Sequence, residues 1–160
     1  MTELPKYSHM EIERRWLVNL AKLGDLRRYA RREIEDLYIS DSRLRLRRVC
    51  GPADEVTFKL GKKYGKCSDL SEPITNLYLT EQEYGQLRSL PGSRARKHRY
   101  AFGGGALDVY VEPCAGLAVF EVEFADERSA RDYEPPVFVT REITAEAEFA
   151  GMSVAGRADA

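Results

Sequence analysis

The chain has 160 residues, of which 43% are hydrophobic and 32% are charged, and its formal net charge is −1. This length fits one ordinary domain, and the hydrophobic share is sufficient for a core. No apolar run approaches the roughly 20 residues that cross a bilayer. Residues 1–16 lack the apolar stretch of a signal peptide. We therefore expect a cytoplasmic protein without a membrane partner.

Cysteine and histidine are too sparse for the usual zinc sites. The three cysteines, Cys50, Cys67 and Cys114, show no CxxC spacing, and the two histidines are His9 and His98. An odd cysteine count without a secretory signal indicates reduced thiols. Any metal would therefore be held by carboxylates, which favour Mg²⁺, Mn²⁺ or Ca²⁺.

The charge is unevenly distributed. Residues 1–66 carry 16 Lys and Arg against 10 Asp and Glu, whereas residues 67–160 carry 9 against 16. The two halves could form opposed walls of one cavity or two solvated surfaces. Nucleic-acid binding by the basic half is a further alternative, but an overall pI near 6.2 speaks against it.

Alternation with a period of two residues predicts strands along most of the chain. In the first, residues 10–18, Glu11, Glu13 and Arg15 share one face and Trp16 lies on the other, where we expect it to pack. The same period recurs in residues 32–39, 43–47, 56–60, 96–102, 106–111 and 117–124.

Turn and helix signals separate these strands. Gly103–Gly105 predicts a hairpin turn; a phosphate cradle would require a following helix, and a strand follows instead. Thr80 and Glu83 have the capping-box spacing of a helix that ends at Pro91-Gly92. A short helix is expected at residues 126–132 and a weaker amphipathic segment at 17–29. From Gly151 we expect a frayed tail, which gives one domain over residues 1–150 and a flexible tail over 151–160.

About eight short strands and a few helices predict an α+β domain built on an antiparallel sheet or barrel. The alternating charges are sorted by strand. Two strands carry paired carboxylates and three carry cations, namely Glu11 and Glu13, Glu121 and Glu123, Arg45 and Arg47, Lys59, and Lys97 and Arg99.

Such sorting makes chemical sense if the charged faces meet across a wet interior. Carboxylates bind hard cations, and Arg makes bidentate contacts with phosphate. Phosphoryl transfer requires positioning, charge neutralisation and an activated water, and these residue types supply all three. The alternative is ordinary solvent-facing charge, which either glutamate pair alone would favour.

Several segments, in order, resemble one known family. EIERRWLV (residues 11–18) resembles the ExExK signature that opens the CYTH superfamily, the triphosphate tunnel metalloenzymes. The similarity continues in IEDLYIS (34–40), RLRLR (43–47), TFKLG (57–61), KHRY (97–100), LDVYVEPCAGLAVFEVEF (107–124) and REITAEAEF (141–149).

The resemblance implies an eight-stranded antiparallel barrel, a tunnel with a polar interior and a few flanking helices, that hydrolyses inorganic triphosphate or a related triphosphate with one or two Mg²⁺ or Mn²⁺ ions. The family's site residues carry over by position. Catalytic roles fall on Glu11, Glu13 and Arg15; metal ligation falls on Glu11, Glu13, Glu121, Glu123 and, with less weight, Asp108; and phosphate binding falls on Arg45, Arg47, Lys59, Lys97 and Arg99.

Four departures from the family pattern bear on activity. Arg15 replaces the signature lysine and cannot easily lose its proton. Pro73 predicts an edge or broken strand at residues 71–76, where only Glu72 of a charged motif remains. Leu37 replaces a glycine, and Glu148 stands where the family often has arginine.

Three alternative functions therefore stay open. The chain could be an adenylyl cyclase or an organic triphosphatase of the same fold, or it could bind polyphosphate or a nucleotide without turnover. A homodimer is also compatible with the sequence. Residues expected outside the site are Tyr38, which we expect to pack, His98, which alternates out of phase with its neighbours, and the basic run Arg27, Arg28, Arg31 and Arg32.

Overall fold

The computed structural model describes residues 3–157. It contains nine strands and three short helices in this part of the chain. The strands are β1 (His9–Val18), β2 (Arg31–Ile39), β3 (Leu44–Cys50), β4 (Val56–Lys63), β5 (Ser71–Leu79), β6 (Gly92–Phe102), β7 (Gly105–Glu112), β8 (Ala118–Glu123) and β9 (Val139–Glu142). The helices are α1 (Glu81–Leu87), α2 (Glu127–Asp132) and α3 (Gly151–Ala155).

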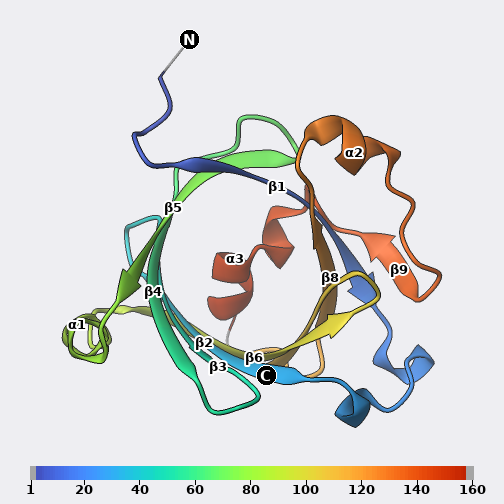
Figure 1. Ribbon diagram of the computed structural model, residues 1–160, viewed down its shortest axis with the longest axis horizontal. Coiled ribbons are helices and arrows are strands. Elements are labelled where there is room, and N and C mark those ends of the chain that lie inside the picture. The colour runs from blue at the N-terminus through green and yellow to red at the C-terminus, as the bar shows by residue number, and fades with distance from the viewer. Residues whose placement is uncertain (1–2, 158–160) are drawn as a thin grey trace.

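Eight of the strands close into an antiparallel barrel, and this confirms the predicted fold. The hydrogen-bonded order is β5-β4-β3-β2-β6-β7-β8-β1, and β1 also pairs with β5 to complete the circle. The ninth strand, β9, pairs with β1. Figure 1 shows the strands as a ring around the viewing direction. Because the barrel is closed, each of its eight strands pairs with a neighbouring strand on both sides.

The expectation of a broken strand near Pro73 is wrong. β5 runs without interruption and pairs with β1 through Ser71–Ile74 and with β4 through Ile74–Leu79. Proline cannot donate to a ladder, but Pro73 lies where β5 exchanges one neighbour for the other. The backbone position without an N–H therefore lies where β5 changes its pairing partner and the barrel closes. The strand continues through it without a break.

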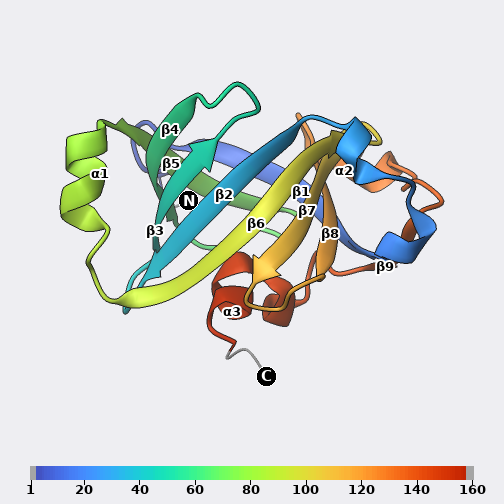
Figure 2. The ribbon, with the colours of Figure 1, turned by 90° about the horizontal axis from the view of Figure 1, so that it is seen from below.

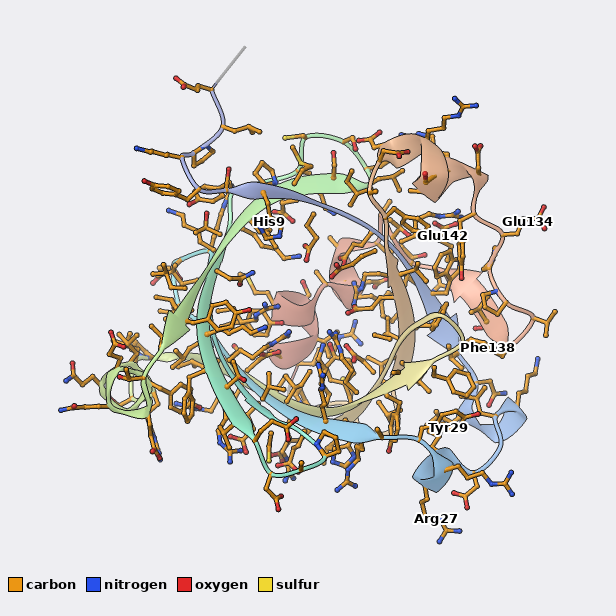
Figure 3. The ribbon with its side chains drawn as sticks, viewed as in Figure 1. His9, Arg27, Tyr29, Glu134, Phe138 and Glu142 are labelled. Atoms are coloured by element: carbon orange, nitrogen blue, oxygen red, sulfur yellow. The ribbon has the colours of Figure 1, made fainter. Side chains whose placement is uncertain are left out.

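The main apolar cluster lies on the outer face of the barrel. Trp16, Val18, Leu107 and Phe120 belong to it, and Phe138 packs against it. Trp16 is 2% exposed, as expected for a packing residue on the face opposite the glutamates. Figure 3 shows Phe138 outside the ring of strands. Because this core is external, the inner face is free to carry charged side chains.

A second apolar cluster closes one end of the barrel. It joins Ala95, Tyr110 and Val119 of the strands to Val154 of α3 and to Ile143. In Figure 1 α3 lies within the ring, and Figure 2 shows it at one end of the strands. The helix therefore acts as a plug.

The frayed tail expected from Gly151 is not what the structure shows, because α3 begins at that residue. Val154 is fully buried. A Cβ at Gly151 would come within 2.0 Å of the Tyr38 hydroxyl oxygen, so glycine permits the close approach of the helix to β2. Residues 158–160 of the predicted tail lie outside the described part.

The other local predictions are confirmed in most respects. The capping box between Thr80 and Glu83 opens α1, and the glycine turn has positive φ at Gly103 (59°) and Gly104 (81°). The amphipathic segment at 17–29 forms two short 3₁₀ turns, Leu20–Lys22 and Leu26–Arg28, instead of one helix.

Within residues 3–157, no helix is both long and apolar enough to cross a membrane.

Candidate active site

Residues from neighbouring strands lie in rungs on the inner face of the barrel. Asp36 is paired in register with Arg47, Arg47 with Lys59, and Lys59 with Tyr78. Residues directly opposite each other in antiparallel strands share a face. This register brings the predicted cations of β3 and β4 together and adds Asp36, which the sequence reasoning missed.

Asp36 holds the arginines of β3. Its carboxylate accepts two hydrogen bonds from Arg47, from Nε to Oδ1 at 2.6 Å and from Nη2 to Oδ2 at 2.8 Å. Arg45 Nε lies 3.9 Å from Oδ1. Burial raises the pKa of Asp36, but Arg47, Arg45 and Lys97 outweigh it and hold the pKa at about 2. The carboxylate therefore stays charged and fixes the guanidinium of Arg47.

Asp108 has the same role for the cations of β6. Lys97 Nζ lies 2.6 Å from Oδ2, and Arg99 donates from Nε to Oδ1 at 2.7 Å and from Nη2 to Oδ2 at 2.8 Å. Arg99 also donates to Glu121. Burial raises the pKa of Asp108, but Lys97 and Arg99 lower it below its ordinary value. Both carboxylate oxygens of Asp108 thus face cations, and its assignment as a metal ligand stays a prediction.

Two of the predicted phosphate-binding cations are not fully paired with other groups within residues 3–157. Arg45 Nε is buried and has no hydrogen-bond partner in the described structure. Lys59 makes no ion pair within residues 3–157, and its ammonium lies 5.3 Å from the ring centre of Tyr78. A Cβ at Gly61 would lie 3.7 Å from Arg45 Nη2 and 2.8 Å from the side-chain oxygen of Asn76. The glycine therefore leaves room beside the Arg45 guanidinium.

Across the barrel, acidic residues occupy the inner faces of β1, β5 and β8. Glu11 is opposite Glu72, and Arg15 is opposite Glu121. Burial, Glu121 and Glu11 together raise the pKa of Glu13 to about 7. The acidic side of the interior, hereafter the acidic wall (Glu11, Glu13, Glu72 and Glu121), thus carries more negative charge than its neighbours neutralise.

Lys63 lies within this acidic wall. Its Nζ is 2.7 Å from Glu11 Oε2 and 3.9 Å from Glu72 Oε2. The sequence reasoning missed it because the strand was expected to stop at Gly61, whereas β4 continues to Lys63. The period of two from Lys59 through Gly61 to Lys63 was the available signal.

Arg15 connects the acidic wall to the plug. Its Nε lies 3.8 Å from Glu121 Oε2, and its Nη1 donates to the Phe149 carbonyl oxygen at 2.9 Å, shortly before α3 begins. Glu123 shares a register position with Glu13 but is exposed. The structure thus brings Glu11, Glu13, Arg15 and Glu121 to one inner wall and places Glu123 where solvent reaches it.

Of the residues expected outside the site, Arg27 and His98 lie outside it, whereas two others face inward. Tyr38 packs against the second apolar cluster as expected, but it lies opposite Arg45 on the inner face, and Arg32 lies opposite Arg99. Arg27 is exposed and points away from the ring of strands in Figure 3. His98 alternates out of phase with Lys97 and Arg99, and its Nε2 lies 3.9 Å from Glu33. In residues 3–157 no group of three or more His, Cys, Asp or Glu side chains is arranged to hold a metal ion.

Comparison with known proteins supports the fold. No family model matches the chain, and no curated protein matches it. Among solved structures, the inorganic triphosphatase NE1496 is 23% identical, with a TM-score of 0.57 over 94% of this chain and 100% of the other. A structure of the hypothetical protein NE1496 is also 23% identical, with a TM-score of 0.56 over 92% of this chain and 99% of the other. At this identity the likeness establishes a shared fold.

Proposed function

We propose that this protein hydrolyses inorganic triphosphate, or a related triphosphate, in the barrel interior with the help of a divalent cation. The observation that carries the proposal is the pair of opposed inner walls. One presents arginines and lysines, of which Arg45 has a buried donor without a partner in the described structure. The other presents carboxylates, among which burial and repulsion from Glu121 and Glu11 raise the pKa of Glu13 to about 7.

The cationic side is organised to receive a polyanion. Asp36 and Asp108 neutralise part of the charge and fix Arg47, Lys97 and Arg99, which lowers the entropy lost when phosphate binds. Arg45 and Lys59 then supply donors that no carboxylate in residues 3–157 fully engages. Charge-assisted bonds from such donors position the phosphates for in-line attack.

The acidic wall fits a hard cation. Glu11, Glu13 and Glu121 provide the carboxylate oxygens that Mg²⁺ and Mn²⁺ prefer, and Glu123 lies opposite Glu13 in the strand register. A bound cation would neutralise phosphate oxygens and activate a water. The close carboxylates without enough counter-charge indicate a site that gains from a cation. Arg15, whose Nε lies 3.8 Å from Glu121 Oε2, orients this wall.

Two features favour a second candidate, a module that binds triphosphate without turnover. Arg15 replaces the lysine of the family signature, and within residues 3–157 the carboxylates do not converge as a ready metal cluster. The chain shares its fold with the inorganic triphosphatase NE1496, but 23% identity does not transfer the activity. The two candidates differ in whether the bound triphosphate is hydrolysed.

Phosphate release separates the candidates. The purified protein is incubated with tripolyphosphate, pyrophosphate, ATP or thiamine triphosphate, with Mg²⁺, Mn²⁺ or excess EDTA. We expect release from tripolyphosphate with either metal and none in EDTA. Glu121→Gln should abolish release, while Glu35→Gln, an outer-face change, should retain it. Full turnover in EDTA contradicts the metal role, and saturable binding without release establishes the binding module.

A further inference from the structure

Lys63 is an unusual neighbour for a cation-binding wall. Its ammonium reaches Glu11 at 2.7 Å and Glu72 at 3.9 Å, from a strand that otherwise belongs to the cationic side. The 2.7 Å ion pair with Glu11 places the positive charge of Lys63 among the carboxylates of the acidic wall.

The local charges set a limit on how many cations the wall takes. Glu121 is in contact with two arginines, Arg99 and Arg15. Of the remaining carboxylates, Glu11 and Glu72 contact the ammonium of Lys63, and Glu13 lies near both Lys63 and Arg15. With all three carboxylates ionised, as metal ligation requires, they and the one ammonium leave two negative charges, which one divalent ion neutralises. A second divalent ion would have to displace or repel Lys63.

We propose that Lys63 is a tethered cation that occupies one cation position of the acidic wall, so that this wall takes a single divalent ion. The inference rests on the proposed function, because it assumes that the acidic wall is the metal side. It assigns Lys63 a positioning role: the ammonium holds Glu11 and Glu72 together and limits the metal stoichiometry.

The same strand supplies a matched control. Lys62 is adjacent to Lys63 but points to the outer face, is exposed, and has its ammonium 5.3 Å from the ring centre of Tyr64. Lys62→Gln and Lys63→Gln remove the same charge from the same strand. They differ in whether the charge faces the carboxylates.

The test is direct Mn²⁺ binding, followed by electron paramagnetic resonance and calorimetry without substrate. We expect the parent and Lys62→Gln to bind one Mn²⁺. Lys63→Gln should bind Mn²⁺ about tenfold more tightly or take up a second ion, because a nearby positive charge has been removed. Lys63→Arg keeps the charge and should restore the parental stoichiometry.

Unchanged Mn²⁺ affinity and stoichiometry in Lys63→Gln would overturn the inference, as would tight uptake of two ions by the parent. If Lys63→Gln does not fold, Glu72→Gln serves in its place: removing one carboxylate beside Lys63 should weaken Mn²⁺ about tenfold, and unchanged binding would count against the proposal. Phosphate release by the parent is scored separately. A parent that is inactive while Lys63→Gln gains Mn²⁺ would contradict the proposed function and support the role of Lys63.

Discussion

Asp36 determines how the arginines of the cationic wall are presented. It is 4% exposed and binds the guanidinium of Arg47 through two short hydrogen bonds. Arg47 is itself buried, so removing its partner leaves an uncompensated charge away from water. Asp36 is a carboxylate, which would repel phosphate, but it keeps the cations of this wall in place.

We expect Asp36→Asn to lower the free energy of unfolding by about 3–5 kcal/mol, the cost of breaking one half of a buried ion pair. Glu35→Gln is the control, because Glu35 is the next residue on β2 and its contact with Arg48, at 3.9 Å, is near the surface. Urea unfolding monitored by circular dichroism measures both. The control should lose less than about 1 kcal/mol. Equal losses would show that Asp36 is not the anchor of this wall.

The raised pKa of Glu13 predicts a pH-dependent stability. The unfolded side chain ionises near its ordinary value of 4.5, whereas the folded one resists ionisation until about pH 7. The folded state therefore binds more protons in this window, and the free energy of unfolding contributed by Glu13 falls as pH rises from about 4.5 to 7.

Glu13→Gln removes that contribution. In excess EDTA the variant should match the parent at pH 4 and exceed its free energy of unfolding by about 2 kcal/mol at pH 8, after allowance for coupling to Glu121 and Glu11. Denaturant titrations at both pH values provide the measurement. A variant that is less stable than the parent at pH 8 would mean that the Glu13 carboxylate is stabilised, and not strained, by its surroundings.

At the scale of elements, the strands that could be predicted are those with local signals. β1, β3 and β4 alternate cleanly, and the register between β3 and β4 follows from the short loop that joins them. β5 could not be predicted intact, because its continuity depends on β1, which is more than fifty residues earlier in the chain. Lys63 was not predicted as a site residue for a related reason. Glycine is typical of a strand end, and the role of Gly61 beside Arg45 is visible only in the structure.

The plug helix could not be predicted from periodicity either. α3 has five residues, too few to show an amphipathic repeat, and it is stable because Val154 packs against Ile143 and the inner faces of the strands. Asp36 was missed for an equivalent reason. A single aspartate in a strand has no signal of its own, and its importance appears only when the register places it opposite Arg47.

Packing of α3 predicts a large effect at Val154. Val154→Asp places a charge where the side chain is 0% exposed, and we expect the free energy of unfolding to fall by about 3 kcal/mol or more. Met152→Asp on the same helix is the control, because Met152 is 46% exposed and should tolerate the charge. Thermal denaturation compares the two variants with the parent. Similar melting temperatures for both variants would show that α3 does not dock as described.

At the scale of the whole molecule, the sorting of charge by strand could be predicted, but its location in the interior depends on barrel closure. Alternation places Arg45, Arg47 and Lys59 on one face of their strands, but only the β1–β5 pairing turns that face inward toward Glu11 and Glu13. The same residues on an open sheet would form a basic surface. The distinction between interior and surface is therefore the one on which the proposed site depends.

Tripolyphosphate binding tests that distinction. An anion that enters the barrel relieves repulsion among the cations, and at about 100 times its dissociation constant it should raise the free energy of unfolding by about 2.7 kcal/mol. Arg45→Gln removes the guanidinium whose buried Nε has no hydrogen-bond partner in the described structure, and affinity should fall roughly tenfold to a hundredfold. Arg28→Gln removes an exposed charge from a 3₁₀ turn outside the barrel, so screening by salt should leave affinity nearly unchanged.

Thermal-shift titrations of both variants against the parent give the comparison. If Arg28→Gln weakens binding as much as Arg45→Gln does, tripolyphosphate binds an open basic surface, because only an interior site makes the two arginines unequal.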